Sequence, residues 1–242
     1  MERLDKYLCS QSTTTRREAG RLIRAGHVTV DGAVCRVPDT KIDPAAAQVA
    51  VDGKPLSYAA CVYWMLNKPA GILCVSRDPK APTVVDLLPP EQRRRGLFPA
   101  GRLDKDTHGL VLLTDDGDFA HAMLSPRRHI PKTYHAVLDK PLSEEAADAF
   151  RAGPTLADGT VCLPAEVRVL EEGEQPLVEV VIFEGKFHQI KRMFAAVGCH
   201  VEWLKRVAMG GLLLDNSLPE GAARPLTEEE KMSIFTKKSP PI

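Results

Sequence analysis

Apolar positions at helical spacing open the chain and predict two short helices. The first is expected over residues 5–10, where leucine and tyrosine recur three and four residues apart. The second is expected to begin after Thr15, because Glu18 stands three residues later and completes a capping box. It should continue to about residue 25 and end at Gly26, since glycine commonly terminates helices.

Short strands are expected to follow these helices. Residues 27–30 alternate between polar and apolar side chains, and residues 49–51 form a second short stretch with the same strand-then-turn arrangement. Each stretch ends in Asp-Gly, at 31–32 and 52–53, which is a strong hairpin-turn signal. The first part of the chain is therefore predicted to be a small unit of two helices and a few strands, followed by a linker over residues 54–60.

The remainder of the chain, to about residue 233, is predicted to form one larger α+β domain. Apolar or alternating runs predict strands at 62–66, 110–114, 133–138, 165–169, 177–183, 200–207 and 211–214. Helical segments are expected to end near residues 123, 151 and 197, with a short helical or turn segment at 83–88. Strands and helices do not alternate strictly, which disfavours a doubly wound parallel sheet. We expect the tail, residues 236–242, to be frayed.

Composition and charge limit the classes of protein to which this chain can belong. The 32 basic residues equal the 32 acidic residues, which excludes a uniformly basic binder but allows a locally basic face. Apolar runs of four or five residues are too short to cross a membrane, and the first ten residues lack the apolar core of a signal peptide. The six cysteines form no C-x-x-C pair, so we expect reduced thiols in a cytoplasmic protein.

Three arginines are predicted to share one face of the second helix. Arg17, Arg21 and Arg24 are spaced three and four residues apart, opposite an apolar face. Guanidinium groups match phosphate oxygens in pairs of hydrogen bonds, which favours binding to a nucleic-acid backbone. A solvated helix face is the alternative, and the arginines alone do not distinguish RNA from DNA.

The N-terminal pattern also resembles a known RNA-binding module. The stretches 3–8, 16–19, 22–23 and 26–32 are similar to those of an S4 domain. This resemblance covers residues 1–57 and implies an S4-like domain that binds RNA.

A loop with two carboxylates is the most unusual stretch of the chain. In residues 101–110, Asp104 and Asp106 lie between Arg102 and Lys105, and glycines bracket the segment. A carboxylate on a loop that leads into a buried strand is well placed for catalysis. A surface loop with solvated charges is the alternative, as is a glycosidase or metal site, but the flanking cations would repel a metal ion.

This loop and six other stretches resemble the RsuA-type pseudouridine synthases. The matching stretches are 65–71, 82–84, 101–110, 113–117, 132–134, 184–194 and 224–227. The likeness is strongest to the family member that modifies small-subunit rRNA. The resemblance implies a mixed, largely antiparallel sheet with the active cleft across its middle, in a catalytic domain of residues 61–235.

The resemblance also implies residue roles. Asp104 corresponds to the catalytic nucleophile or base, Tyr134 to the tyrosine that stacks on the base, and Lys191 to a cation that keeps the carboxylate ionised. We therefore expect an ion pair between Lys191 and Asp104. Arg102 is expected to contact a phosphate or to fill the position vacated by the base. The remaining assignments are Arg192 to substrate binding, Asp106 to loop structure and His188 to orienting the loop before the Lys191 helix.

The predicted function is a cofactor-free isomerase that converts a uridine of ribosomal RNA to pseudouridine. Small-subunit rRNA is the expected substrate, naked or in an assembly particle, and we expect a monomer with no bound metal. The alternatives are a synthase of the same family acting on large-subunit rRNA, and a non-catalytic RNA-binding or ribosome-assembly factor. A third class, an aspartate-dependent phosphatase or glycosidase, would need a metal site or a second placed carboxylic acid.

Overall fold

A computed structural model describes residues 1–236 of the 242-residue chain, so the frayed tail expected at 236–242 lies outside the described residues except for its first position. The chain divides into two compact units, and the first contains residues 1–62 together with 88–98. Residues 88–98 join this unit through hydrogen bonds, because Arg95 N donates to Ser12 O at 3.0 Å and Arg94 Nη1 donates to Ala59 O at 2.9 Å. The boundaries 1–57 and 61–235 stay a prediction.

The first unit contains the two expected helices and short strands. Helix α1 is Leu4–Ser10 and α2 is Arg16–Ala25, where Thr15 and Glu18 form the predicted capping box and Gly26 is left-handed. Strands β3 (Ala33–Val34), β2 (Val28–Val30), β5 (Val49–Val51) and β6 (Lys54–Pro55) form one antiparallel sheet in that order, and β1 (Glu2–Arg3) pairs with β4 (Lys41–Ile42). The core contains Leu4, Tyr7, Leu8, Ala19, Ile23, Val28, Ile42 and Val49.

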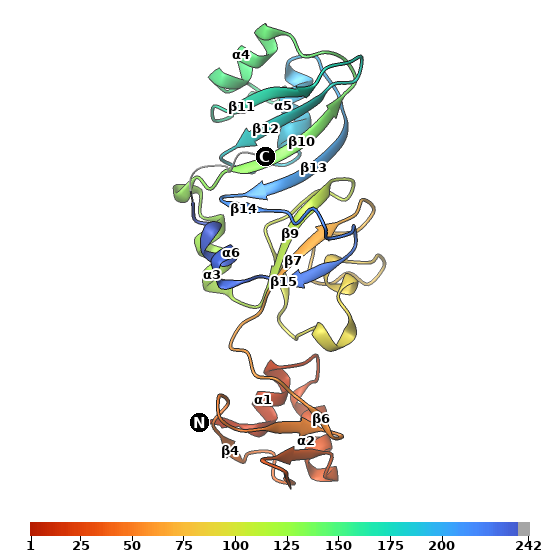
Figure 1. Ribbon diagram of the computed structural model, residues 1–242, viewed down its shortest axis with the longest axis vertical. Coiled ribbons are helices and arrows are strands. Elements are labelled where there is room, and N and C mark those ends of the chain that lie inside the picture. Colours follow the sequence, from red (N-terminus) through yellow and green to blue (C-terminus); the bar gives the residue numbers. More distant parts are fainter. Residues whose placement is uncertain (237–242) are drawn as a thin grey trace. The chain divides into compact units, whose positions relative to one another are not determined.

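A mixed sheet forms the centre of the second unit (Figure 1). Its strands, in spatial order, are β11 (Glu166–Glu171), β12 (Leu177–Ile182), β10 (Lys132–Leu138), β13 (Val201–Met209), β9 (His108–Thr114), β7 (Tyr63–Lys68) and β15 (Ala223–Pro225). In addition β14 (Leu212–Leu213) pairs with β13, and β8 (Phe98–Ala100) pairs with β9. The strand pairs of this path are antiparallel except β13 with β9, which confirms the predicted fold class.

The parallel pair is where the two halves of the sheet join. Lys205 and Arg206 on β13 stand opposite His108 and Gly109 on β9. A Cβ atom at Gly109 would lie 2.2 Å from the carbonyl oxygen of Arg206, and the φ angle of Gly109 is +100°. Only glycine fits such a close approach of two backbones at positive φ. The loop with the two carboxylates enters β9 at this junction.

Helices pack in pairs beside the two halves of the sheet. α4 (Glu144–Ala152) meets α5 (Gln189–Ala196) through Phe150 and Phe194, whose ring centroids are 4.7 Å apart. α3 (Gly117–Leu124) and α6 (Glu228–Ser233) lie near β7 and β15 (Figure 1). Short 3₁₀ turns occupy Val84–Leu87, Pro90–Gln92 and Pro126–Arg128.

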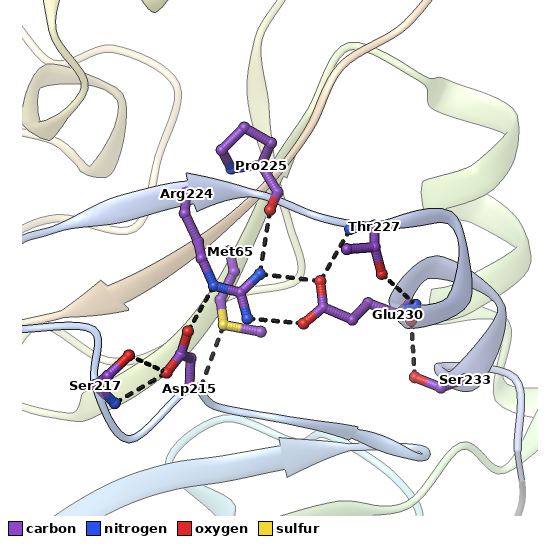
Figure 2. A network of polar contacts seen from close by, with 8 residues as sticks. All are labelled: Met65, Asp215, Ser217, Arg224, Pro225, Thr227, Glu230 and Ser233. Atoms are coloured by element: carbon purple, nitrogen blue, oxygen red, sulfur yellow. Dashed lines mark hydrogen bonds and ion pairs between the residues drawn. The ribbon is translucent and has the colours of Figure 1, made fainter.

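A polar network fastens α6 to the edge of the sheet (Figure 2). Arg224 on β15 donates to Asp215 at 2.7 Å and to both carboxylate oxygens of Glu230 at 2.7 and 2.9 Å. Glu230 also closes a capping box with Thr227 at the start of α6. The Arg224 hydrogen bond is the largest influence that lowers the pKa of Glu230, and hydrogen bonds from Ser217 and Arg224 lower the pKa of Asp215 to about 2.

Most of the predicted elements are present, and some of them differ at their ends. The helix expected to end near residue 197 begins at Gln189, because His188 adopts a left-handed conformation at its N-cap. Strand β15 and helix α6 were not predicted. Within the described residues, no helix is long and apolar enough to span a membrane.

Candidate active site

A cavity of about 880 Å³ opens over the middle of the sheet in the second unit. Its walls come from the loop around 101–107, strands β10 and β13, the segment 182–191, and the C-terminal end of α3. The cavity therefore adjoins the junction between the two halves of the sheet, where the resemblance placed the cleft. A volume of this size is within the range of ligand pockets.

A buried lysine holds the backbone of the carboxylate loop. Lys68 is fully buried, and its Nζ donates to Lys105 O at 3.1 Å, Thr107 O at 2.8 Å and Pro69 O at 3.0 Å. The backbone N–H of Gly71 also donates to Lys105 O at 2.8 Å. Burial lowers the pKa of Lys68. Residues 65–71 therefore hold the backbone of the carboxylate loop in place, a role that was not predicted from the sequence.

Asp104 lies on the cavity wall beside a histidine. Its side chain is 30% exposed, and its Oδ1 is 3.5 Å from Nε2 of His188. His188 has a positive φ of 47°, and its ring stacks on Phe187 with centroids 3.9 Å apart. Phe187 is 74% exposed at the same wall. The sequence analysis assigned His188 to orienting the loop before the Lys191 helix and gave Phe187 no role, so the closeness of His188 to Asp104 was not predicted.

The predicted ion pair between Lys191 and Asp104 is wrong for this structure. Lys191 Nζ instead lies 2.5 Å from Oδ2 of Asp106, which was assigned to loop structure alone. The hydrogen bond from Lys191 is the largest influence on the pKa of Asp106 and lowers it. The loop turns where Thr107 N donates to Asp104 O at 3.1 Å, and the two carboxylates then face different partners. Spacing in sequence cannot show which of two nearby carboxylates faces a distant lysine.

Tyr134 lies on the sheet side of the cavity. It is 7% exposed on β10, directly opposite Arg206 of β13. Residues opposite each other in an antiparallel pair share one face of the sheet. Lys132, two residues before Tyr134, is half-buried and also lines the cavity. Neither Lys132 nor Arg206 was predicted as a site residue, although the two-residue spacing from Tyr134 to Lys132 was a usable signal.

The other predicted site residues are distributed more widely. Arg102 is exposed and lines the cavity with Asp104. Arg192 is not among the lining residues; its Nη2 pairs with Asp158 at 2.5 Å and its Nη1 donates to Phe187 O at 3.3 Å. Arg17, Arg21 and Arg24 are exposed on α2 in the first unit, as the pattern predicted. Residues 1–236 contain no group of three histidine, cysteine, aspartate or glutamate side chains suited to a metal ion.

Two family profiles match the chain. The profile of the RNA pseudouridylate synthase family matches residues 62–196, and that of the S4 domain matches residues 2–47. The chain belongs to the RNA pseudouridylate synthase family. In this pseudouridine synthase, most of the residues that line the cavity lie within the stretch that the family profile matches.

Individual relatives extend the likeness over nearly the whole synthase. Ribosomal small subunit pseudouridine synthase A of Escherichia coli (strain K12) is 45% identical over 234 residues, which are 96% of this chain and 99% of the relative. The uncharacterized RNA pseudouridine synthase YtzG of Bacillus subtilis (strain 168) is 42% identical over 229 residues, 94% of this chain and 96% of the relative. A solved structure, described as the crystal structure of pseudouridylate synthase, has a TM-score of 0.66 and 36% identity, with 97% of this chain and 100% of that chain covered.

Proposed function

We propose that this pseudouridine synthase isomerises one uridine of small-subunit ribosomal RNA in the cytoplasm, acting as a monomer. The small-subunit assignment is supported by the similarity to ribosomal small subunit pseudouridine synthase A over 96% of the chain. The S4 domain supports binding of a structured RNA, and its exposed arginines on α2 offer contacts to phosphates.

Asp104 is proposed to act as the nucleophile or base. The observation that carries this assignment is its place on the cavity wall, with Tyr134 on the sheet side of the same cavity. A uridine in folded RNA must leave its stack to reach such a cavity, which costs a few kcal/mol. Stacking on an aromatic ring returns about 1–3 kcal/mol per base, and Tyr134 is suited to supply it.

The chemistry needs no redox partner, because pseudouridine and uridine are isomers. The N1–C1′ bond breaks, the uracil turns, and C5 bonds to C1′ with loss of the C5 proton and gain of one at N1. Asp104 would attack the sugar or the base, or remove a proton from the sugar; each route needs an ionised carboxylate in a site that protects the detached ring from water. Arg102, exposed beside Asp104, is proposed to contact a phosphate or to fill the vacated base position.

Replacing Asp104 by asparagine tests the catalytic assignment. We expect Asp104→Asn to lower tritium release from [5-³H]uridine-labelled RNA by about a thousandfold or more, because the amide can neither attack nor accept a proton. The dissociation constant for the RNA should change less than threefold. Asp106→Asn is the matched control, since it removes the same charge from the same loop, and it should keep most of the turnover. Normal turnover in Asp104→Asn would refute the assignment.

A second experiment tests the substrate. Pseudouridines are mapped by chemical probing in rRNA from cells with and without the protein. Loss of one pseudouridine from small-subunit rRNA is expected, and complementation with Asp104→Asn should not restore it. Loss from large-subunit rRNA, or an rRNA pattern without change, would contradict the assignment. Purified naked rRNA and assembly particles, compared as substrates, then show which form the enzyme uses.

A further inference from the structure

Two cations share the sheet side of the cavity with Tyr134. Tyr134 of β10 stands opposite Arg206 of β13, and the register shifts between Thr133 and Tyr134. Residues three apart on a regular strand face opposite sides of the sheet. The bulge changes this alternation, so both Arg206 and Met209 line the cavity. Lys132 is two residues from Tyr134 and lines the same cavity. A lysine, an arginine and the base-stacking tyrosine are thus presented together.

Arg206 has hydrogen-bonding capacity that the described residues do not use. It is 1% exposed, and its Nε donates to Leu110 O at 2.8 Å. Its Nη2 is buried and finds no hydrogen-bond partner among residues 1–236. Buried donors are almost always paired, and Arg206 is one of the residues that line the cavity, so its unpaired nitrogen is a donor that a ligand oxygen could use.

Lys132 adds a second positive charge at the same wall. Its Nζ donates to Ile130 O at 3.2 Å, which uses one of three N–H donors of the ammonium group. Burial, and next the charge of Arg206, lower the pKa of Lys132 to about 8, while Glu184 acts in the opposite direction. Glu184 is already engaged, because it accepts from Lys186, from Leu163 N at 3.0 Å and from Gln189 Nε2 at 2.8 Å.

The two cations are therefore incompletely neutralised inside a half-enclosed site. We propose that Lys132 and Arg206 form a cationic subsite that binds the carbonyl oxygens of the target uracil and stabilises the ring while it carries negative charge. This inference rests on the proposed function, because it requires the target base to enter this cavity.

The charge on the ring follows from the bonds that change. When the N1–C1′ bond breaks, its electron pair stays on the uracil and spreads over N1, O2 and O4. The charge is the same whether Asp104 bonds to C1′ or takes the C2′ proton, and attack of Asp104 on the ring also places charge there. As C5 bonds to C1′, the bond between Asp104 and C1′ breaks or the proton returns from Asp104 to C2′; in the route through the ring, the bond between Asp104 and the ring breaks. Loss of the C5 proton and protonation of N1 then remove the charge. Donors fixed where charge develops lower the barrier.

A phosphate is the other anion that such a subsite could hold. The burial of Arg206 favours the base, because the backbone of an extruded nucleotide stays nearer to solvent than its base. An RNA with an abasic site at the target position distinguishes binding of the uracil from binding of a phosphate, since it keeps the phosphates and lacks the ring.

Lys132→Met tests the proposal because it keeps most of the side chain's length and removes its charge. We expect the single-turnover rate constant at saturating enzyme to fall about a hundredfold, as for loss of one oxyanion-stabilising donor. Binding of abasic RNA should change less than threefold. Lys205→Met is the matched control: Lys205 precedes Arg206 on β13, opposite His135, and does not line the cavity, so its rate should stay near that of the wild type.

The pH profile provides a readout that a purely structural role would not change. Besides Lys132, the ionisable groups that line the cavity are Cys74, Arg102, Asp104, Lys105, Tyr134, Glu184, Lys186, His188, Lys191 and Arg206. Lys132 in the free enzyme is cationic below its pKa of about 8, so the wild-type kcat/KM should fall as pH rises through about 8. Lys132→Arg should keep most activity and move this decline to higher pH, because guanidinium stays protonated.

Several outcomes would overturn the proposal. A wild-type rate in Lys132→Met, or a loss confined to binding of abasic RNA, would exclude a uracil subsite, and the second result would indicate a phosphate clamp. Thermal unfolding shows whether the variant is folded; if it is not, Lys132→Gln is measured instead, and a wild-type rate in that variant would refute the proposal. Absence of isomerisation in the wild type would instead refute the proposed function.

Discussion

Lys68 illustrates how one buried side chain sets the geometry of a site that it does not enter. Its ammonium group satisfies three backbone carbonyls, two of which belong to the loop that carries Asp104. A buried charge is tolerated when hydrogen bonds replace its hydration. The carboxylate loop is thus positioned by a contact that lies below it in the sheet.

Removing this contact should affect both stability and catalysis. We expect Lys68→Met to lower the free energy of unfolding by about 1–3 kcal/mol, because buried carbonyls lose their partner. Turnover should fall at least tenfold, since the loop is no longer held in place. Urea unfolding and tritium release measure the two effects, and Lys80→Met, at an exposed position, is the control. Wild-type turnover in Lys68→Met would show that the loop needs no such anchor.

Single residues also mark the limit of prediction from sequence. The glycine-bracketed loop and the alternation at Tyr134 were sufficient to nominate Asp104 and Tyr134 once the family resemblance was noted. The partner of Lys191 was not predictable, because Asp104 and Asp106 are two residues apart and only the turn at Thr107 decides which one faces α5. Arg206 was missed because its burial depends on β9, which is distant in sequence.

At the scale of elements, α6 and β15 are held together by charge. Arg224 bridges Asp215 and Glu230, and Glu230 caps the helix through Thr227 (Figure 2). The capping box was visible in the sequence as threonine followed three residues later by glutamate. The segment after this capping box lacks a clear apolar period, so the sequence alone does not predict a helix there. Contacts with the rest of the unit define this helix.

The network should make this corner sensitive to acid. The pKa values of Asp215 and Glu230 are below their ordinary values in the folded protein, so their stabilisation is present at neutral pH and is lost as pH falls from about 5 towards 2. Arg224→Met should destabilise the protein at pH 7 by about 1 kcal/mol, and the difference from wild type should shrink at pH 3. Urea unfolding at both pH values measures this.

Arg151→Met is the control for that experiment. Arg151 also pairs with two carboxylates, Glu144 and Asp148, but on an exposed helix face, where ion pairs contribute little. Its effect should be smaller at pH 7. An Arg224→Met effect that is independent of pH would mean that packing, and not charge, holds α6.

At the scale of the whole molecule, zero formal charge conceals a local concentration of cations. The exposed arginines of α2 are the clearest example in the first unit. Individual helices and strands were predictable because turns and hydrophobic periods are local, whereas the largely antiparallel sheet was expected from the family resemblance. The parallel pairing of β9 with β13 was not predictable, because it joins positions almost a hundred residues apart that carry no local signal of each other.

Salt dependence tests the contribution of the first unit to RNA binding. We expect replacement of Arg17, Arg21 and Arg24 by glutamine to weaken RNA binding and to reduce the slope of log K against log salt by about 2, if each contacts one phosphate. A matched variant replaces Lys140, Arg151 and Arg168, three exposed cations of the second unit, and should leave the slope unchanged. Equal slopes in both variants would exclude α2 from the interface.

The position of β7 between β9 and β15 has a consequence for biogenesis. β7 is among the first strands of its sheet to be synthesised, yet the strand that covers its outer edge comes near the end of the chain, and the Asn67 amide donates to Leu218 O, 151 residues later. Until then an apolar strand with free backbone groups is open to pairing with other chains. Nascent or C-terminally truncated forms should therefore be prone to aggregate and to need chaperones, whatever the stability of the finished enzyme.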